Sequence, residues 1–246
     1  MNASGQPDKG RLVERMRTVM AAVDRTDETY RFNFKSGLST FPIPFFGNIL
    51  TAKVLTIGVN PSADEFVGRK WPDRLEADAL THRLLHYFDS PPGPHPWFSP
   101  WIEALGLLNV EHARGEAAHL DLSPRATVSM SSVPDTNLFL GMISHDLRWF
   151  FDFLGECTQV QLLMAAGTVT ERWYLNQFLA LHGPHHRLEI QPPPQTSDRC
   201  ALYAATHLGK NLPLFFSSVS PSNLGRAHVL VENVRTNRER LNRLLN

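Results

Sequence analysis

Short runs of β-branched and apolar residues alternate along this chain with longer segments of helical periodicity, and this alternation restricts the possible folds most strongly. The apolar runs cover residues 51–59, 118–122, 159–165, 187–190 and 212–216. The helical segments cover residues 12–23, 73–88, 137–154, 168–181 and 225–245. Strands that alternate with helices predict a mainly parallel sheet with helices on both faces. We therefore expect an α/β protein, a three-layer α/β/α domain around a short, mainly parallel central sheet.

The length of the chain agrees with one large domain. It has 246 residues, of which 42% are hydrophobic, enough to bury a sizeable core. Residues 1–10 are small and polar, and we expect a flexible arm there followed by a single domain over 11–246. Two proline-rich stretches, 91–100 and 191–194, are expected to be surface loops, because the apolar segments around them are needed in one sheet.

Charge and cysteine content exclude several classes of protein. Its 24 Lys and Arg balance its 24 Asp and Glu, so the chain lacks the strongly basic signature of many nucleic-acid-binding proteins, although a local basic stripe remains possible. Two cysteines, Cys157 and Cys200, cannot build a four-thiolate iron–sulfur cluster or zinc site. Neither a signal peptide nor a run of 18 apolar residues is found. We expect a cytoplasmic monomer with no metal, no cofactor and no membrane partner.

Polar turns follow three of the expected strands, and ligands in parallel sheets bind beyond the carboxyl ends of strands. These turns cover residues 58–66, 121–127 and 217–226. Strand–turn–helix junctions direct backbone N–H groups toward anions and polar ligands. They are also ordinary helix starts: Ser62 and Glu65 match a capping box, and Ser222 or Asn223 could cap the last helix. A single junction therefore indicates a helix start more than a binding site.

Two of these junctions together resemble the motifs of the uracil-DNA glycosylase superfamily. Gly58-Val59-Asn60-Pro61-Ser62 is similar to its first motif, closest to the mismatch-specific and single-strand-selective branches that use Asn. Ser220-Pro221-Ser222-Asn223-Leu224 is similar to its second motif, with Ser220 in place of the family's His or Asn. The order and separation of the motifs agree over residues 50 to 230. The resemblance implies a glycosylase-like α/β fold and a DNA-binding site that takes up a flipped base.

The resemblance also implies roles for individual residues. Asn60 would orient the attacking water, and Ser220 would donate a hydrogen bond to the departing base. Asp121 would read the pairing edge of the base. Leu224 would fill the gap that the base leaves, although an ordinary core contact explains a leucine at this position equally well. The other base-binding candidates are Gly58, Val59, Pro61, Phe66 and Trp71. The other DNA-binding candidates are Ser62, Arg125, Ser222, Asn223 and Arg226.

The sequence thus predicts a hydrolase that removes uracil or a related deaminated base from DNA by cleaving the N-glycosidic bond. Two alternatives stay open. One is a module of the same fold that binds nucleic acid without cleaving it. The other is a hydrolase of a small nucleoside or nucleotide.

Overall fold

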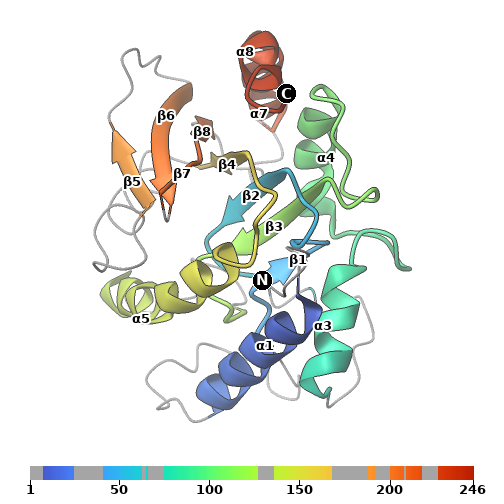
Figure 1. Cartoon of the computed structure of the whole chain (residues 1–246), viewed down its shortest axis with the longest axis vertical. Coiled ribbons are helices and arrows are strands. Elements are labelled where there is room, and N and C mark those ends of the chain that lie inside the picture. The colour runs from blue at the N-terminus through green and yellow to red at the C-terminus, as the bar shows by residue number, and fades with distance from the viewer. Residues whose placement is uncertain are drawn as a thin grey trace. The chain divides into compact units, whose positions relative to one another are not determined.

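The structure of the protein is a computed structural model (Figure 1). It describes residues 8–24, 41–62, 65, 75–126, 136–167, 188–191, 200–207, 209–217 and 227–246. The chain divides into two compact units. The first contains Met1–Leu50, Gly58–Gly93 and Leu120–Thr158, and the second contains Thr51–Ile57, Pro94–His119 and Gln159–Asn246. Two of the boundaries between the units fall inside strands, and the single domain expected over 11–246 stays a prediction.

The described strands form a sheet with the order β1-β3-β2-β4-β8-β6-β5, and β7 pairs with β6. Their bounds are Phe45–Phe46 (β1), Val54–Gly58 (β2), Ala117–Asp121 (β3), Leu162–Ala166 (β4), Leu188–Gln191 (β5), Cys200–His207 (β6), Lys210–Asn211 (β7) and Leu214–Ser217 (β8). In the second unit, β2, β4 and β8 run parallel: Ile57 pairs with Ala165, which pairs with Phe216. Strands β5, β6 and β7 form the antiparallel side. The protein is therefore a mixed α/β protein with a mainly parallel central sheet.

The five strands expected from the sequence are all present, but the two-residue strands β1 and β7 and the longer strand β6 were not predicted. The sequence of β6, CALYAATH, contains three alanines, which are weak strand formers. The sheet nevertheless gives β6 an alternating pattern: Ala201, Tyr203 and His207 are buried, while Ala204 is exposed. Tertiary pairing with β8 and β5, rather than local propensity, makes this segment a strand.

Helix α1 covers Lys9–Asp24, so Lys9 and Gly10 belong to the helix rather than to the expected arm. The physical reason is a cap. The Asp8 carboxylate accepts hydrogen bonds from the backbone N–H groups of Gly10 at 2.9 Å and Arg11 at 3.3 Å. The predicted apolar stripe of α1 is confirmed by the burial of Leu12, Met16 and Val19.

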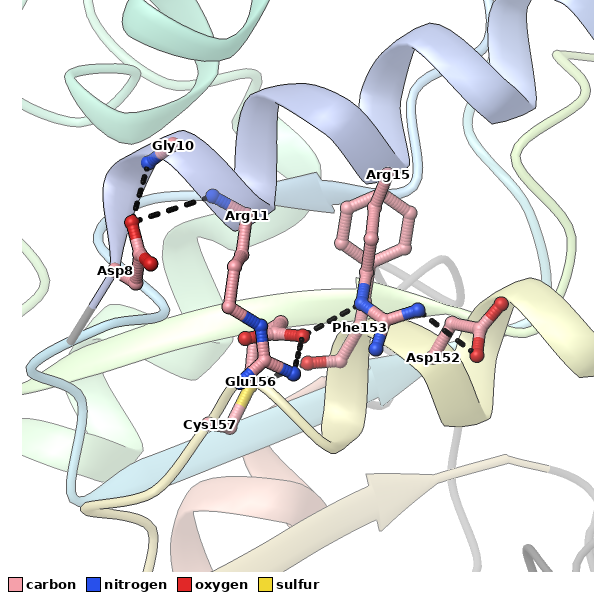
Figure 2. A network of polar contacts seen from close by, with 8 residues as sticks. All are labelled: Asp8, Gly10, Arg11, Arg15, Asp152, Phe153, Glu156 and Cys157. Carbon is pink, nitrogen blue, oxygen red and sulfur yellow. Dashed lines mark hydrogen bonds and ion pairs between the residues drawn. The ribbon is translucent and has the colours of Figure 1, made fainter. Parts of the chain in front are cut away.

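Ion pairs attach α1 to the end of helix α5 (Thr136–Leu154) within the first unit, as Figure 2 shows. The Glu156 carboxylate accepts from Arg15 Nε at 2.6 Å and from Arg11 Nη2 at 3.1 Å. Arg15 also reaches Asp152 at 3.1 Å. Only 6% of the Glu156 side chain is exposed, whereas 48% of Arg11 and 31% of Arg15 are, so these pairs are buried on the carboxylate side alone.

The proline-rich stretch 91–100 is not entirely a loop, which corrects our expectation. It contains a short 3₁₀ helix, Pro96–Phe98 (η2), and the start of helix α4, Ser99–Gly106. Proline is tolerated in the first turn of a helix, where its missing N–H would have no intrahelical partner. The His95 ring accepts from the Trp97 backbone N–H at 3.2 Å and caps η2.

The remaining described helices lie within segments that the sequence predicts to be helical. Helix α3 covers Ala77–Leu85 and packs against α1 within the first unit. The expected helix over 225–245 is divided into α7, His228–Thr236, and α8, Arg238–Asn242, with Asn237 between them. In the second unit, α7 packs against α4 and β8. The expected helix over 168–181 and residues 192–194 lie outside the described residues.

In the part of the chain that the structure describes, none of the helices has the length and apolar character that crossing a membrane requires.

Candidate functional site

The segments that follow β2 and β3 are joined by backbone hydrogen bonds beyond the ends of the strands. Leu122 N–H donates to the Gly58 carbonyl and Ser123 N–H donates to the Val59 carbonyl, both at 3.0 Å. In both bonds the donor residue comes the same number of positions after its acceptor residue, so the two segments run in the same direction. The first motif and the turn after β3 therefore lie side by side in the first unit, as the parallel-sheet prediction requires.

Asn60 lies at the centre of this pair of segments. Its side-chain Nδ2 donates to the backbone carbonyls of Pro61 at 3.1 Å and Arg125 at 3.0 Å. These two acceptors define which end of the amide is nitrogen, because an oxygen in its place would face two carbonyl oxygens. The Oδ1 end is consequently directed away from both carbonyls. The residue is half-buried, so its orientation is set by the protein rather than by solvent.

Ser62 and Glu65 continue the first motif. The Glu65 N–H donates to the Ser62 carbonyl at 3.2 Å, as at the start of a helical turn. The Glu65 carboxylate is buried and receives the Tyr87 hydroxyl at 2.8 Å from each of its oxygens. The Glu65 side chain thus packs against Tyr87 in the described structure, and its expected role in a capping box stays a prediction.

Asp121 and Arg125 follow β3, and both are buried, with 3% and 7% of their surfaces exposed. The backbone N–H of Asp121 donates to the Pro44 carbonyl at 3.1 Å. Arg125 Nε donates to Asp146 Oδ2 at 2.8 Å, and its guanidinium lies 5.7 Å from the centre of the Trp149 ring. The guanidinium is therefore enclosed against a buried carboxylate in the described structure, and the expected contact of Arg125 with DNA stays a prediction.

The second unit contains a buried group of aromatic and histidine side chains that the sequence did not indicate. Thr56 Oγ1 lies 2.7 Å from His119 Nδ1, and the rings of Trp97 and Phe98 lie 5.1 and 5.2 Å from the His119 ring. Burial, and after it the charge of His119, lowers the pKa of His112 to about 3. The only signal in the sequence was the high number of histidines, 11, which does not indicate which of them are buried.

The strand and the helix that flank the second motif are described, and the motif itself is not. Ser217 ends β8, and its hydroxyl accepts from Asn233 Nδ2 of α7 at 2.9 Å. The candidates Ser220, Ser222, Asn223, Leu224 and Arg226 lie outside the described residues, as do Phe66 and Trp71. The arginines of the last two helices that are described and exposed are Arg235, Arg238, Arg240 and Arg243.

Within the described ranges, no three or more His, Cys, Asp or Glu side chains are grouped so that they could hold a metal ion. Neither a protein-family model nor a curated protein matches the chain. The interpretation of the site therefore depends on its own geometry and on the two sequence motifs.

Proposed function

We propose that this protein is a DNA N-glycosylase that removes uracil or a related deaminated base, acting as a monomer of three-layer α/β/α architecture in the cytoplasm. The observation that carries the proposal is the position of Asn60. It follows a parallel strand directly, where ligands of such sheets bind, and two backbone carbonyls orient its amide. The resemblance of the two Pro-Ser motifs supplies the class of substrate.

The proposed reaction breaks the bond between the sugar and the base, so positive charge develops on the sugar and negative charge on the base. Asn60 would hold a water molecule through Oδ1 for attack on the sugar carbon. As the water oxygen bonds to the sugar carbon, the electron pair of the broken bond stays on the base, and the proton that water loses passes through solvent to that base. Asn60 can orient water but cannot accept this proton, so we expect a slow enzyme. Ser220 would stabilise the anionic base by donating a hydrogen bond. Gly58, Val59, Pro61 and Asp121 would line the base site, together with Phe66 or Trp71.

The proposed DNA contacts are Ser62, Ser222, Asn223, Leu224 and Arg226. Arg125 is the remaining candidate, and it would have to leave its pair with Asp146 to reach DNA. The burial of Arg125 favours one alternative, hydrolysis of a free nucleoside or nucleotide, since such a substrate needs no basic surface for a phosphate chain.

The test is an oligonucleotide that carries one uracil, hypoxanthine or xanthine, incubated with the protein and then with alkali. We expect cleavage at the modified position by the natural protein and none by Asn60→Ala. The matched control is Asn48→Ala, which removes an asparagine that accepts only a local hydrogen bond from Leu50 in the described structure. It should leave cleavage unchanged.

Three results would reject the proposal in different ways. DNA binding without cleavage of any of the three substrates, unaltered by Asn60→Ala, would indicate a binding module. Cleavage of a free nucleoside without affinity for the oligonucleotides would indicate the nucleoside hydrolase. Equal cleavage by the natural protein and Asn60→Ala would show that Asn60 does not hold the water.

A further inference from the structure

The carboxylate of Asp146, on helix α5, accepts hydrogen bonds from side chains of the turn that follows β3. Its side chain is fully buried. Asp146 Oδ2 accepts from Ser123 Oγ at 2.7 Å and from Arg125 Nε at 2.8 Å, and Oδ1 lies 3.4 Å from Arg125 Nη2. His145 Nδ1 lies 2.8 Å from Oδ1. A buried charge with this many partners determines the geometry of all of them.

The turn that Asp146 holds is the turn that orients Asn60. Ser123 Oγ, which donates to Asp146, also accepts from the backbone N–H of Arg125 at 3.2 Å. Arg125 is thus held by its side chain and by its backbone. Its carbonyl oxygen accepts from Asn60 Nδ2. The contacts from Asp146 to Asn60, direct or through Ser123, therefore all pass through Arg125. These residues all belong to the first unit.

Stability alone is a weak reason for this arrangement. The transfer of an arginine and an aspartate from water into a protein interior is costly, and apolar residues of similar volume often stabilise such sites as well. What a buried ion pair with hydrogen bonds does provide is a defined position for the backbone around it. Here that backbone is the acceptor for Asn60.

We propose that Asp146 is a positioning residue for Asn60: it fixes the Arg125 carbonyl and so the direction of the Asn60 amide. The inference rests on the proposed function in one respect only, the role of Asn60 in holding water. The direct consequence is structural, since loss of the Asp146 charge releases Arg125 and alters the hydrogen bond at Asn60 Nδ2. The consequence for catalysis is a misplaced water.

The test compares Asp146→Asn with Glu156→Gln. Both variants replace a buried carboxylate on or just after α5 that pairs with arginine, but Glu156 binds Arg11 and Arg15 instead of the turn after β3. Under single-turnover conditions with saturating substrate, we expect Asp146→Asn to lower the cleavage rate about 10- to 100-fold, because small misplacements of reacting groups have effects of this size. The affinity for the oligonucleotide should change less than about twofold. Glu156→Gln should leave both quantities within about twofold.

A second measurement is independent of activity. The side-chain NH₂ group of Asn60 is observed by ¹⁵N NMR and assigned by its loss in Asn60→Ala. We expect Asp146→Asn to shift these signals and to accelerate their hydrogen exchange, and Glu156→Gln to leave them unchanged. Ser123→Ala removes one donor to Asp146 and should act in the same direction with a smaller effect, so it replaces Asp146→Asn if that variant does not fold.

The two proposals fail in distinguishable ways. If the natural protein cleaves no substrate but Asp146→Asn shifts the Asn60 signals, the glycosylase assignment is wrong and the positioning role stands. If the natural protein is active and both Asp146→Asn and Ser123→Ala leave the Asn60 signals and the cleavage rate unchanged, the positioning role is wrong. If Glu156→Gln lowers the rate as much as Asp146→Asn, the effect of Asp146 is general destabilisation, and the positioning role is again wrong.

Discussion

The side-chain nitrogen of Asn60 lies 3.0 Å from the backbone carbonyl oxygen of Arg125, a residue 65 positions later in the chain. The contact joins the turn after β2 to the turn after β3, and it requires a donor at residue 60. An aspartate there would place a carboxylate oxygen against two carbonyl oxygens, so the identity of this residue is constrained by structure as well as by any chemistry.

We predict that Asn60→Asp lowers the free energy of unfolding at pH 7 by about 1–3 kcal/mol, the usual cost of an unsatisfied buried polar contact. Repulsion by the carbonyls of Pro61 and Arg125 should raise the pKa of the new carboxyl group in the folded protein. The destabilisation should therefore be largest above this pKa and decrease as the pH falls through it. Urea denaturation of both proteins at pH 7 and pH 4 measures the difference. Equal stability at pH 7 would contradict the prediction.

Removal of the Tyr87 hydroxyl tests the packing role of Glu65. Tyr87→Phe keeps the buried ring, which lies 4.5 Å from the Phe46 ring, and deletes the donor to the carboxylate. We expect a loss of about 1.5–3 kcal/mol, the range for hydrogen bonds to charged groups. Thermal and urea denaturation provide the measurement.

A matched control for Tyr87→Phe is the same change in a Glu65→Gln background. The second loss should be smaller there, since a neutral amide gains less from the hydroxyl than a carboxylate does. An equal loss in both backgrounds would show that the hydroxyl acts through a group other than Glu65.

The lowered pKa of His112 predicts a loss of stability in acid. In the unfolded chain a histidine binds its proton near pH 6.5, whereas in the folded protein His112 does so only near pH 3. The unfolded state therefore binds more protons between these values, and stability falls as the pH decreases through this window. At ~1.4 kcal/mol per pKa unit, the change from pH 6.5 to pH 5 is about 2 kcal/mol.

Urea denaturation at several pH values measures this slope for the natural protein and for His112→Gln, which cannot titrate. The curve of free energy of unfolding against pH should be flatter for His112→Gln over this window. Parallel curves would mean that His112 is not the group responsible.

Helix α1 takes part in two ion pairs that differ in burial. Arg15 pairs with Glu156, whose side chain is only 6% exposed, while Arg17 pairs with Glu14 and both of these side chains are exposed. Double-mutant cycles with Arg→Met and Glu→Gln substitutions should give a coupling energy of about 1–3 kcal/mol for the first pair. For the exposed pair we expect about 0.5 kcal/mol or less, and a decrease with added salt. Similar coupling energies for both pairs would contradict the role of burial.

Part of the fold could be predicted from local patterns. The apolar runs that became β2 and β8 contain β-branched or aromatic residues, which favour strands, and the apolar residues of α1 have helical spacing. Strand β6 could not be predicted in this way, because its alanines carry little local preference and its pairing with β8 decides its conformation. Helix α4 was not predicted, because the proline in its first turn suggested a loop, although proline is permitted at that position of a helix.

For the candidate site, the order of residues was enough to predict which polar side chains follow the strands, because a parallel sheet directs the carboxyl ends of its strands to one edge. It therefore placed Asn60 beside the turn that contains Arg125. The contacts of these side chains could be known only from the folded structure. Whether an arginine faces solvent or a buried carboxylate depends on Asp146, which is supplied by a distant helix. Likewise, the pKa of His112 depends on burial and on His119. Charge and hydrogen bonding act through space, whereas the sequence records only the order of residues along the chain.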